Sequence, residues 1–239
     1  MLSNNKQKGF TLLEVLLAVS ITAIIGIGAS QLLSNISNTN ITTEQRSDQL
    51  RNIQRMDLWL KRDLWQLTGR KTLDEFGSPK DAFTSQGGFL IEFTHSGQGM
   101  IPFGDKKRSN LQRVAYAMRS HDSEYCDDAI KPIESEEVGN CFIRLFWPIL
   151  DLAADSKPPI VQVLLDNVES VAFQFRGRTL DFNDPNNSIG SNEWQDTWPS
   201  PYKTKGMVDD LVQIKMRYEI KMLGQLERIY EIPRHAYAQ

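Results

Sequence analysis

The chain has 239 residues, with 27 basic and 30 acidic side chains and a formal net charge of -3. This near balance gives no support for nucleic-acid binding, which depends on a basic surface. Hydrophobic residues make up 40% of the chain and aromatic residues 9%, as is ordinary for a folded core. The roughly 170 residues that follow the N-terminal helical region suit one globular domain.

The N-terminus combines a short basic leader, a glycine and a long apolar run. Lys6 and Lys8 precede Gly9, and Glu14 is the only charged residue between positions 10 and 33. This run is long enough to span a bilayer. A carboxylate near the centre of such a span costs about 2.5–3.5 kcal/mol on insertion scales, so we expect a compensating interaction for Glu14. The two lysines place the leader on the cytoplasmic side and the remaining chain in the periplasm.

Residues 8–14, Lys-Gly-Phe-Thr-Leu-Leu-Glu, carry the most specific pattern of this region. A secretory signal would be cut after the apolar run, at small residues, and a plain membrane anchor would not explain Glu14. The pattern resembles the type III signal sequence of the type IV pilin superfamily, which includes the type II secretion pseudopilins. The resemblance implies that a prepilin peptidase cuts after Gly9 and that the new terminal residue, Phe10, is N-methylated.

The physical chemistry of Glu14 supports this interpretation independently. Cleavage after Gly9 would place the amine of Phe10 one helical turn from Glu14. Each group is costly in lipid alone, and the two charges can neutralise one another. The amine of an entering subunit could instead pair with Glu14 of a neighbour, which would set the axial register of a helical bundle. Glu14 is therefore predicted to form an assembly salt bridge.

The helix is expected to continue beyond the membrane as a periplasmic spine over 34–68. Residues 34–43 are rich in Ser, Asn and Thr, which favour helix caps over helix interiors. The helix is expected to pass through this stretch, and the sequence does not decide whether it is kinked there. Residues that recur at spacings of three and four form one side of the spine, and all of them except Asp57 are apolar. They are Leu50, Ile53, Asp57, Leu60, Leu64 and Leu67. The charged side near Arg51 to Asp63 is the predicted surface for partner helices.

After Gly69 the pattern changes to strands and loops, which predicts an α+β chain with a long helix packed on an antiparallel sheet. Strands are expected at 89–93, 114–118, 141–147, 171–175, 213–222 and 226–232. The strand at 213–222 alternates apolar with mostly charged residues, which is typical of an antiparallel sheet with one wet face. An acidic loop at 122–137 and a polar loop at 181–205 interrupt the sheet.

Four segments make up the expected domain organisation. They are a prepilin leader at 1–9, a transmembrane helix at 10–33, the helical spine at 34–68 and a periplasmic β-rich globular domain at 69–239.

Cys126 and Cys141 are the only cysteines. In an oxidising periplasm such a pair is more typical of a disulfide than of a metal site. Closing a loop of this size would stabilise the fold by about 3 kcal/mol in the chain-entropy model. Two unpaired thiols remain the alternative, because the sequence does not show that the two residues approach in space.

A weak calcium site is the only metal hypothesis that the sequence offers. One loop supplies hard oxygen ligands from Asp181, Asn183, Asp184 and Glu193. Its spacing departs from an EF-hand, and a polar turn whose side chains bond their own backbone is the alternative. No cofactor is expected. Trp194 and Trp198, in the same polar loop, are either core anchors or aromatics that face a partner.

Several segments of the globular part resemble the J-type minor pseudopilins of type II secretion systems. They are residues 58–67, 108–116, 146–151, 164–175, 193–199 and the last strand pair, which closes on Ile232. The resemblance implies a pilin-like fold and a place in the pseudopilus tip complex. The implied partners are the I-, K- and H-type minor pseudopilins and the major pseudopilin, whose assembly the complex is thought to prime for export of folded periplasmic proteins.

The implied location is the inner membrane, crossed once, with a cytoplasmic N-terminus and a periplasmic domain. A minor pilin of a type IV pilus or competence apparatus is the alternative, because it would share the leader. An anchored enzyme is the least supported class, since the sequence has no nucleophile elbow, metal-ligand spacing or phosphate loop. We therefore predict a structural assembly protein without enzymatic activity.

Overall fold

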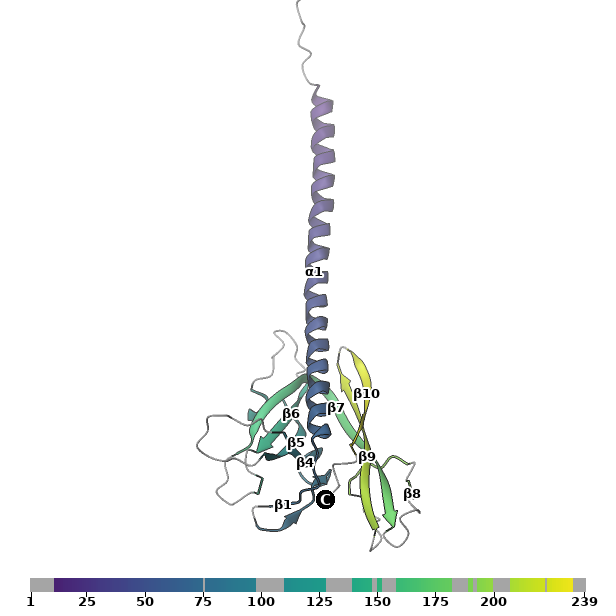
Figure 1. Cartoon of the computed structure of the whole chain (residues 1–239). Helices are drawn as coiled ribbons and strands as arrows, with labels where there is room; N and C mark the ends of the chain where they lie inside the picture. The colour runs from purple at the N-terminus through teal and green to yellow at the C-terminus, as the bar shows by residue number, and fades with distance from the viewer. Residues whose placement is uncertain are drawn as a thin grey trace, which may run out of the picture. The chain divides into compact units, whose positions relative to one another are not determined.

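Figure 1 shows the computed structural model of the chain. The residues that it describes are 11–74, 76–97, 110–127, 139–147, 150–151, 158–181, 189–190, 193–199, 207–221 and 223–233. The structure divides into two compact units, with the boundary between Arg51 and Asn52. The first unit holds most of a long helix, and the second holds the end of that helix and all the strands in the described residues.

Helix α1 (Leu12–Trp65) is 54 residues long. Its segment Leu12–Ser37 is long and apolar enough to cross a membrane. The hydroxyls of Ser20, Thr22 and Thr39 each donate to the carbonyl four residues earlier, at 2.8 Å. Such bonds satisfy polar side chains inside a helix. The helix continues without a break through residues 34–43, where the sequence left a kink open.

A large antiparallel sheet forms most of the second unit, which confirms the predicted fold class (Figure 1). Its strands are β3 (Phe83–Thr84), β4 (Ile91–Ser96), β5 (Leu111–Arg119), β6 (Asn140–Trp147), β7 (Ile160–Asp181), β8 (Ile189–Gly190), β9 (Met207–Ile220) and β10 (Gly224–Glu231). The order is β10-β9-β7-β6-β5-β4-β3, with β8 beside β7. A separate two-stranded sheet contains β1 (Thr72–Leu73) and β2 (Pro79–Lys80), and a 3-10 helix, η1, covers Glu124–Cys126.

Strand β7 links the two halves of the large sheet. Its first part, from Ile160 to Val168, pairs with β6, and the part from Val168 to Asp181 pairs with β9. Val168 pairs with both strands, and the register of β7 with β9 shifts between Val168 and Ser170. The sequence predicted only residues 171–175 of this 22-residue strand. The extra length depends on pairing with two different strands, which local periodicity does not report.

The hydrophobic core lies between the end of α1 and one face of the sheet. The helix contributes Ile53, Met56, Leu60 and Leu64 to it, all almost fully buried. Aromatic rings from four strands continue the core, with centroids 5.6–6.2 Å apart along the series Phe83, Phe93, Tyr116 and Phe142. A smaller cluster contains Ala115, Ala117, Cys126, Cys141, Ile143, Leu145 and Trp147.

Two expectations for the spine are wrong. Leu50 is 50% exposed, because burial of the helix begins only at Ile53, just after the boundary between the two units. Asp63, which the sequence analysis placed on the exposed charged side, is 0% exposed. Polar side chains of β6 and β5 provide it with partners, which the helical pattern alone does not reveal.

The expected strand ends also shift, because pairing rather than composition decides them. β4 begins at Ile91 instead of residue 89, and β9 extends from Met207 to Ile220 instead of covering 213–222. The expectation of a wet face is wrong at Lys215, which is 7% exposed. The ring of Trp194 covers the Lys215 ammonium at 4.0 Å from its centroid.

Candidate functional site

The N-terminal end of α1 holds the predicted assembly carboxylate. The backbone N–H and the hydroxyl of Thr11 both donate to Oε2 of Glu14, each at 3.1 Å. The N–H of Glu14 donates in return to Oγ1 of Thr11 at 3.3 Å. This reciprocal arrangement is a capping box, in which the first and fourth residues satisfy each other's free backbone groups. Glu14 therefore has a structural partner within its own chain.

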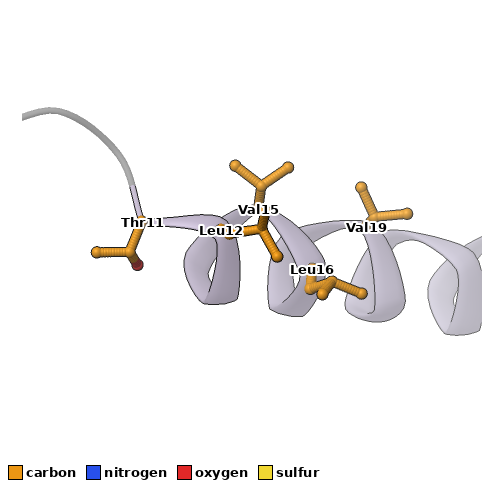
Figure 2. Close-up of a pocket in the computed structure, with 5 residues that line it drawn as sticks. All are labelled: Thr11, Leu12, Val15, Leu16 and Val19. Carbon is orange, nitrogen blue, oxygen red and sulfur yellow. The ribbon is translucent and has the colours of Figure 1, made fainter.

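An apolar hollow lies beside this cap. Its lining residues, Thr11, Leu12, Val15, Leu16 and Val19, come from successive turns of one helix face (Figure 2). Thr11 supplies the only polar side chain of the lining. Such a surface offers no set of convergent polar groups for a small polar ligand, and it suits contact with lipid or with another apolar helix.

The role of Thr11 was missed in the sequence analysis. The signal was present, because Thr-x-x-Glu before an apolar run is the sequence pattern of a capping box. The leader residues Lys6, Lys8, Gly9 and Phe10 lie outside the described residues. Leader cleavage and the pairing of Glu14 with a Phe10 amine therefore stay predictions.

Cys126 and Cys141 form a disulfide, with Cα atoms 6.0 Å apart. Both residues are fully buried, and the bond joins η1 to the start of β6. The disulfide thus fixes the first part of the acidic loop to the sheet. The later part of that loop, from residue 128 to residue 138, lies outside the described residues.

The calcium hypothesis is not tested by the structure. Asn183 and Asp184 lie outside the described residues, and only the backbone of Asp181, at the end of β7, is described. Glu193 lies in the described segment 193–199. Within the described ranges, no group of three or more His, Cys, Asp or Glu side chains is arranged to hold a metal ion. The site stays a prediction.

A buried ionic group that the sequence analysis did not foresee connects α1 to the sheet. Oδ2 of Asp63 accepts from Nε of Arg144 at 2.6 Å and from the hydroxyl of Tyr116 at 2.8 Å. All three residues are at most 4% exposed. Burial, and then the charge of Asp63, raise the pKa of Tyr116 well above its usual value, so this phenol remains a hydrogen-bond donor.

A second aspartate of α1, whose side chain is 32% exposed, contacts the other half of the sheet. The hydroxyl of Tyr230, on β10, donates to Oδ1 of Asp57 at 2.6 Å. Nε of Arg228 lies 4.0 Å from the same oxygen. Burial and the hydrogen bond to Asp57 raise the pKa of Tyr230. Asp57 and Asp63 thus each combine a tyrosine hydroxyl with an arginine of the sheet.

A separate buried ion pair lies away from the helix. Arg113, on β5, and Glu92, on β4, form an ion pair, and both are at most 3% exposed. Nζ of Lys80 lies 2.6 Å from the other oxygen of Glu92, and the guanidinium of Arg113 also donates to Thr72. This group holds the sheet of β1 and β2 to the large sheet, so its effect is local to that hairpin.

The two tryptophans of the polar loop have different environments. Trp198 is 4% exposed and therefore belongs to the core. Trp194 is half-buried, with the guanidinium of Arg176 4.4 Å and the ammonium of Lys215 4.0 Å from its ring centroid. These cation–π contacts use the ring to cover two charged side chains of the sheet.

Comparison with known proteins agrees with these features. Residues 31–232 match the family described as Type II secretion system (T2SS), protein J, and residues 4–30 match the prokaryotic N-terminal methylation motif. The chain is 26% identical over 230 residues to a type II secretion system protein J of Escherichia coli, covering 94% of this chain and 95% of that protein. It is 23% identical over 234 residues to a protein J of Vibrio cholerae, covering 95% and 88% respectively.

A solved structure shares the fold. It is described as the GspK-GspI-GspJ complex from the type 2 secretion system of enterotoxigenic Escherichia coli. The match has a TM-score of 0.52 and 23% sequence identity, and it covers 77% of this chain and 97% of the solved chain.

The family match covers most of the chain, and the methylation motif covers the region of the apolar helix and its single carboxylate. These findings confirm the resemblance to J-type minor pseudopilins that the sequence segments indicated. The chain belongs to the type II secretion system protein J family.

Proposed function

We propose that this minor pseudopilin is a subunit of the pseudopilus tip complex and helps to prime assembly of the major pseudopilin for export of folded proteins. The observation that carries the proposal is Glu14, a lone carboxylate on an exposed apolar helix that is long enough to span a membrane. A charge at that position is costly in lipid and requires a function. Family membership favours secretion over the minor-pilin alternative.

Leader removal would change the interactions of Glu14. In the structure its carboxylate accepts two hydrogen bonds from Thr11. Cleavage after Gly9 would add a positive amine at Phe10, next to this carboxylate. A charge-assisted contact with an amine is stronger than a neutral hydrogen bond, so the amine of an entering subunit can replace the Thr11 hydroxyl as partner.

The proposed membrane arrangement follows from the same segment. The apolar helix anchors the chain in the inner membrane, with Lys6 and Lys8 on the cytoplasmic side and the unit from Asn52 onward in the periplasm. The proposed partners are I-, K- and H-type minor pseudopilins, with the prepilin peptidase acting on the leader. The role is structural, so we propose no catalytic reaction.

Co-purification tests the proposal most directly. The full chain would be co-expressed with the I- and K-type minor pseudopilins of the same cell and purified from detergent-solubilised membranes. We expect a stable binary or ternary complex. Recovery with type IV pilus subunits in place of these partners would contradict the secretion role.

The role of Glu14 has its own test, a Glu14→Gln variant assayed for secretion of an exported protein. The variant keeps the shape of the side chain but removes the charge, whose hydrogen bonds are worth about 1.5–3 kcal/mol, so we expect a decrease of about tenfold or more. Ser20→Ala is the matched control, since the Ser20 hydroxyl bonds only to its own helix, at the carbonyl of Leu16. Equal secretion by Glu14→Gln and Ser20→Ala would contradict the proposed salt bridge.

A further inference from the structure

The part of α1 that packs on the sheet has two opposite apolar sides. Four buried side chains, Ile53, Met56, Leu60 and Leu64, fall within about 80° of the helix circumference at about 100° per residue. Two large exposed side chains, Leu58 (66% exposed) and Trp65 (59% exposed), lie on the far side. Apolar contacts are not directional, so hydrophobicity alone does not specify one rotation of this helix strongly.

Asp57 and Asp63 flank the buried stripe on opposite edges. With about 100° per residue, each lies about 20° beyond one end of the stripe. Asp63 binds Arg144 and Tyr116 of one half of the sheet, and Asp57 binds Tyr230 of the other half. Rotating the helix in either direction would pull one carboxylate away from its partners. Separating Asp63 from Arg144 would leave a buried charge unpaired, which costs several kcal/mol. Separating Asp57, whose side chain is 32% exposed, would leave the buried hydroxyl of Tyr230 without its hydrogen bond.

We propose that these two clamps, Asp57–Tyr230 and Asp63–Arg144–Tyr116, set the rotation of α1 on the sheet and thereby decide which face of the helix is offered to a neighbouring subunit. The offered face is centred on Leu58. The identity of the neighbouring subunit rests on the proposed function. The rotation of α1 on the sheet is a property of the single chain and does not depend on it.

The charge of the offered face specifies the kind of partner. Between Asn52 and Trp65 the exposed charged side chains are Arg55, Lys61 and Arg62, all basic, whereas both aspartates of this segment face the sheet. The face therefore fits the α-helix of another pilin-like subunit, with acidic residues beside an apolar stripe.

Thiol labelling of the full chain can measure the rotation. The only two cysteines are joined in a disulfide, so an introduced cysteine is the only free thiol. Leu58→Cys reports the exposed side, and Leu60→Cys, at a position that is 0% exposed, reports the buried side. In the otherwise unchanged chain we expect maleimide to label the first variant at least about tenfold faster, because local opening limits access to the thiol of the second.

The decisive variant replaces the larger clamp by apolar residues of similar size, as Asp63→Leu, Tyr116→Phe and Arg144→Met together. Such replacements of buried ion pairs are often neutral or stabilising, so thermal unfolding should remain cooperative at a similar temperature. We expect the labelling ratio, the rate of the Leu58→Cys thiol divided by that of the Leu60→Cys thiol, to fall by about threefold or more. An unchanged ratio in the folded variant would show that the apolar stripe alone sets the rotation, and would overturn the proposal.

Two further variants make the result specific. Glu92→Leu with Arg113→Met removes a buried ion pair whose other partners, Lys80 and Thr72, belong to β2 and β1, so it should leave the labelling ratio unchanged. Asp57→Leu with Tyr230→Phe removes the clamp at the other edge and should lower the ratio as well. Failure of both clamp variants to fold would also overturn the proposal, because it requires the apolar stripe to hold the helix without the clamps.

Co-purification separates this proposal from the proposed function. The Asp63 triple variant should lose the I- and K-type partners that the unchanged chain retains. Retention of these partners despite an altered labelling ratio would overturn the assignment of the offered face. If the unchanged chain binds no such partner, the proposed function fails, while the labelling result still decides the rotation.

Discussion

Asp63 shows how a charged residue is accommodated on the buried side of a helix. Its carboxylate loses all contact with water, and the hydrogen bonds from Arg144 and Tyr116 compensate for that loss at Oδ2, whereas Oδ1 accepts no hydrogen bond from the described residues and lies 4.0 Å from Nε of Arg62. A buried ion pair contributes little net stability against an apolar replacement, but removing one partner leaves the other charge uncompensated. Replacing Asp63 alone should therefore lower the stability more than replacing Asp63 together with its partners by apolar residues.

We expect Asp63→Ala to destabilise the protein by about 3–5 kcal/mol, because Arg144 would stay buried without its carboxylate. Urea unfolding of the full chain in detergent measures this change. Asp48→Ala is the control, since Asp48 pairs with Arg51 at an exposed site, where such pairs contribute about 1 kcal/mol or less. Equal small effects of the two substitutions would contradict the importance of the buried pair.

His95 makes stability depend on pH. It is 2% exposed; burial lowers its pKa below the usual 6.5, Asp63 raises it, and Arg144 and Arg62 lower it. The unfolded chain therefore takes up a proton at higher pH than the folded chain does. The stability that neutral His95 contributes is present above about pH 6.5 and decreases as pH falls towards the folded pKa, by at most about 1.4 kcal/mol per pH unit.

Urea midpoints at pH 7.5 and pH 5.5 test the His95 prediction when they are compared between the unchanged chain and His95→Gln. A glutamine side chain does not titrate, so the variant should lose less stability over this interval. Carboxylates are present in both chains, and their contribution cancels in the comparison. The same loss in both proteins would exclude His95 as the source.

At the scale of elements, the segment 193–199 joins distant parts of the sheet. Gln195 exchanges two backbone hydrogen bonds with Phe175 on β7, at 2.7 and 2.8 Å. Next to β3, the N–H of Ser85 donates to the carbonyl of Trp198 and the N–H of Trp198 donates to the Ser85 hydroxyl, both at 2.7 Å. The Trp198 ring then lies against Gly177, so that glycine is required for close approach.

Gly177→Ala should destabilise the fold by about 1–3 kcal/mol, as overpacking of a filled core does. The added Cβ would lie 2.3 Å from the Trp198 ring, so the ring or β7 must move. Gly88→Ala is the matched control, because nothing lies within 4 Å of its Cβ position. Thermal unfolding compares the two variants, and a Gly177→Ala protein as stable as Gly88→Ala would contradict the packing argument.

The disulfide between η1 and β6 should also matter at this scale. Replacing both cysteines by alanine should lower stability by about 3 kcal/mol in the chain-entropy model, because the bond closes a loop with a sequence separation of 15. The denaturation midpoint with and without a reducing agent measures the effect in the unchanged chain. The double variant provides the control, since a reductant should not alter its midpoint.

At the scale of the whole molecule, the chain combines a membrane-competent helix with a β-rich unit that has its own core. We expect the mature protein to begin at Phe10 and to carry one added methyl group on its amine. Mass spectrometry of the purified chain checks both changes. A mass that includes residues 1–9 would contradict the proposed processing, whereas loss of the leader without the methyl group would contradict only the second step.

The sequence determined those features that depend on neighbouring residues. The apolar run with Glu14, the helical spacing that buries Leu60 and Leu64, and the alternation along β9 are all local patterns, and each was predicted. The Thr11 cap belongs to the same class, because its signal spans only four residues.

The tertiary structure alone decided which distant side chains meet. Asp63 lies 53 residues from Tyr116 and 81 residues from Arg144, and helical periodicity, which places it at the edge of the buried stripe, does not name these partners. The bond between Cys126 and Cys141 and the close contact of Trp198 with Gly177 likewise depend on how the strands pair. Local spacing reports the face of one element, whereas the partner of a buried charge or ring is set by the packing of several elements together.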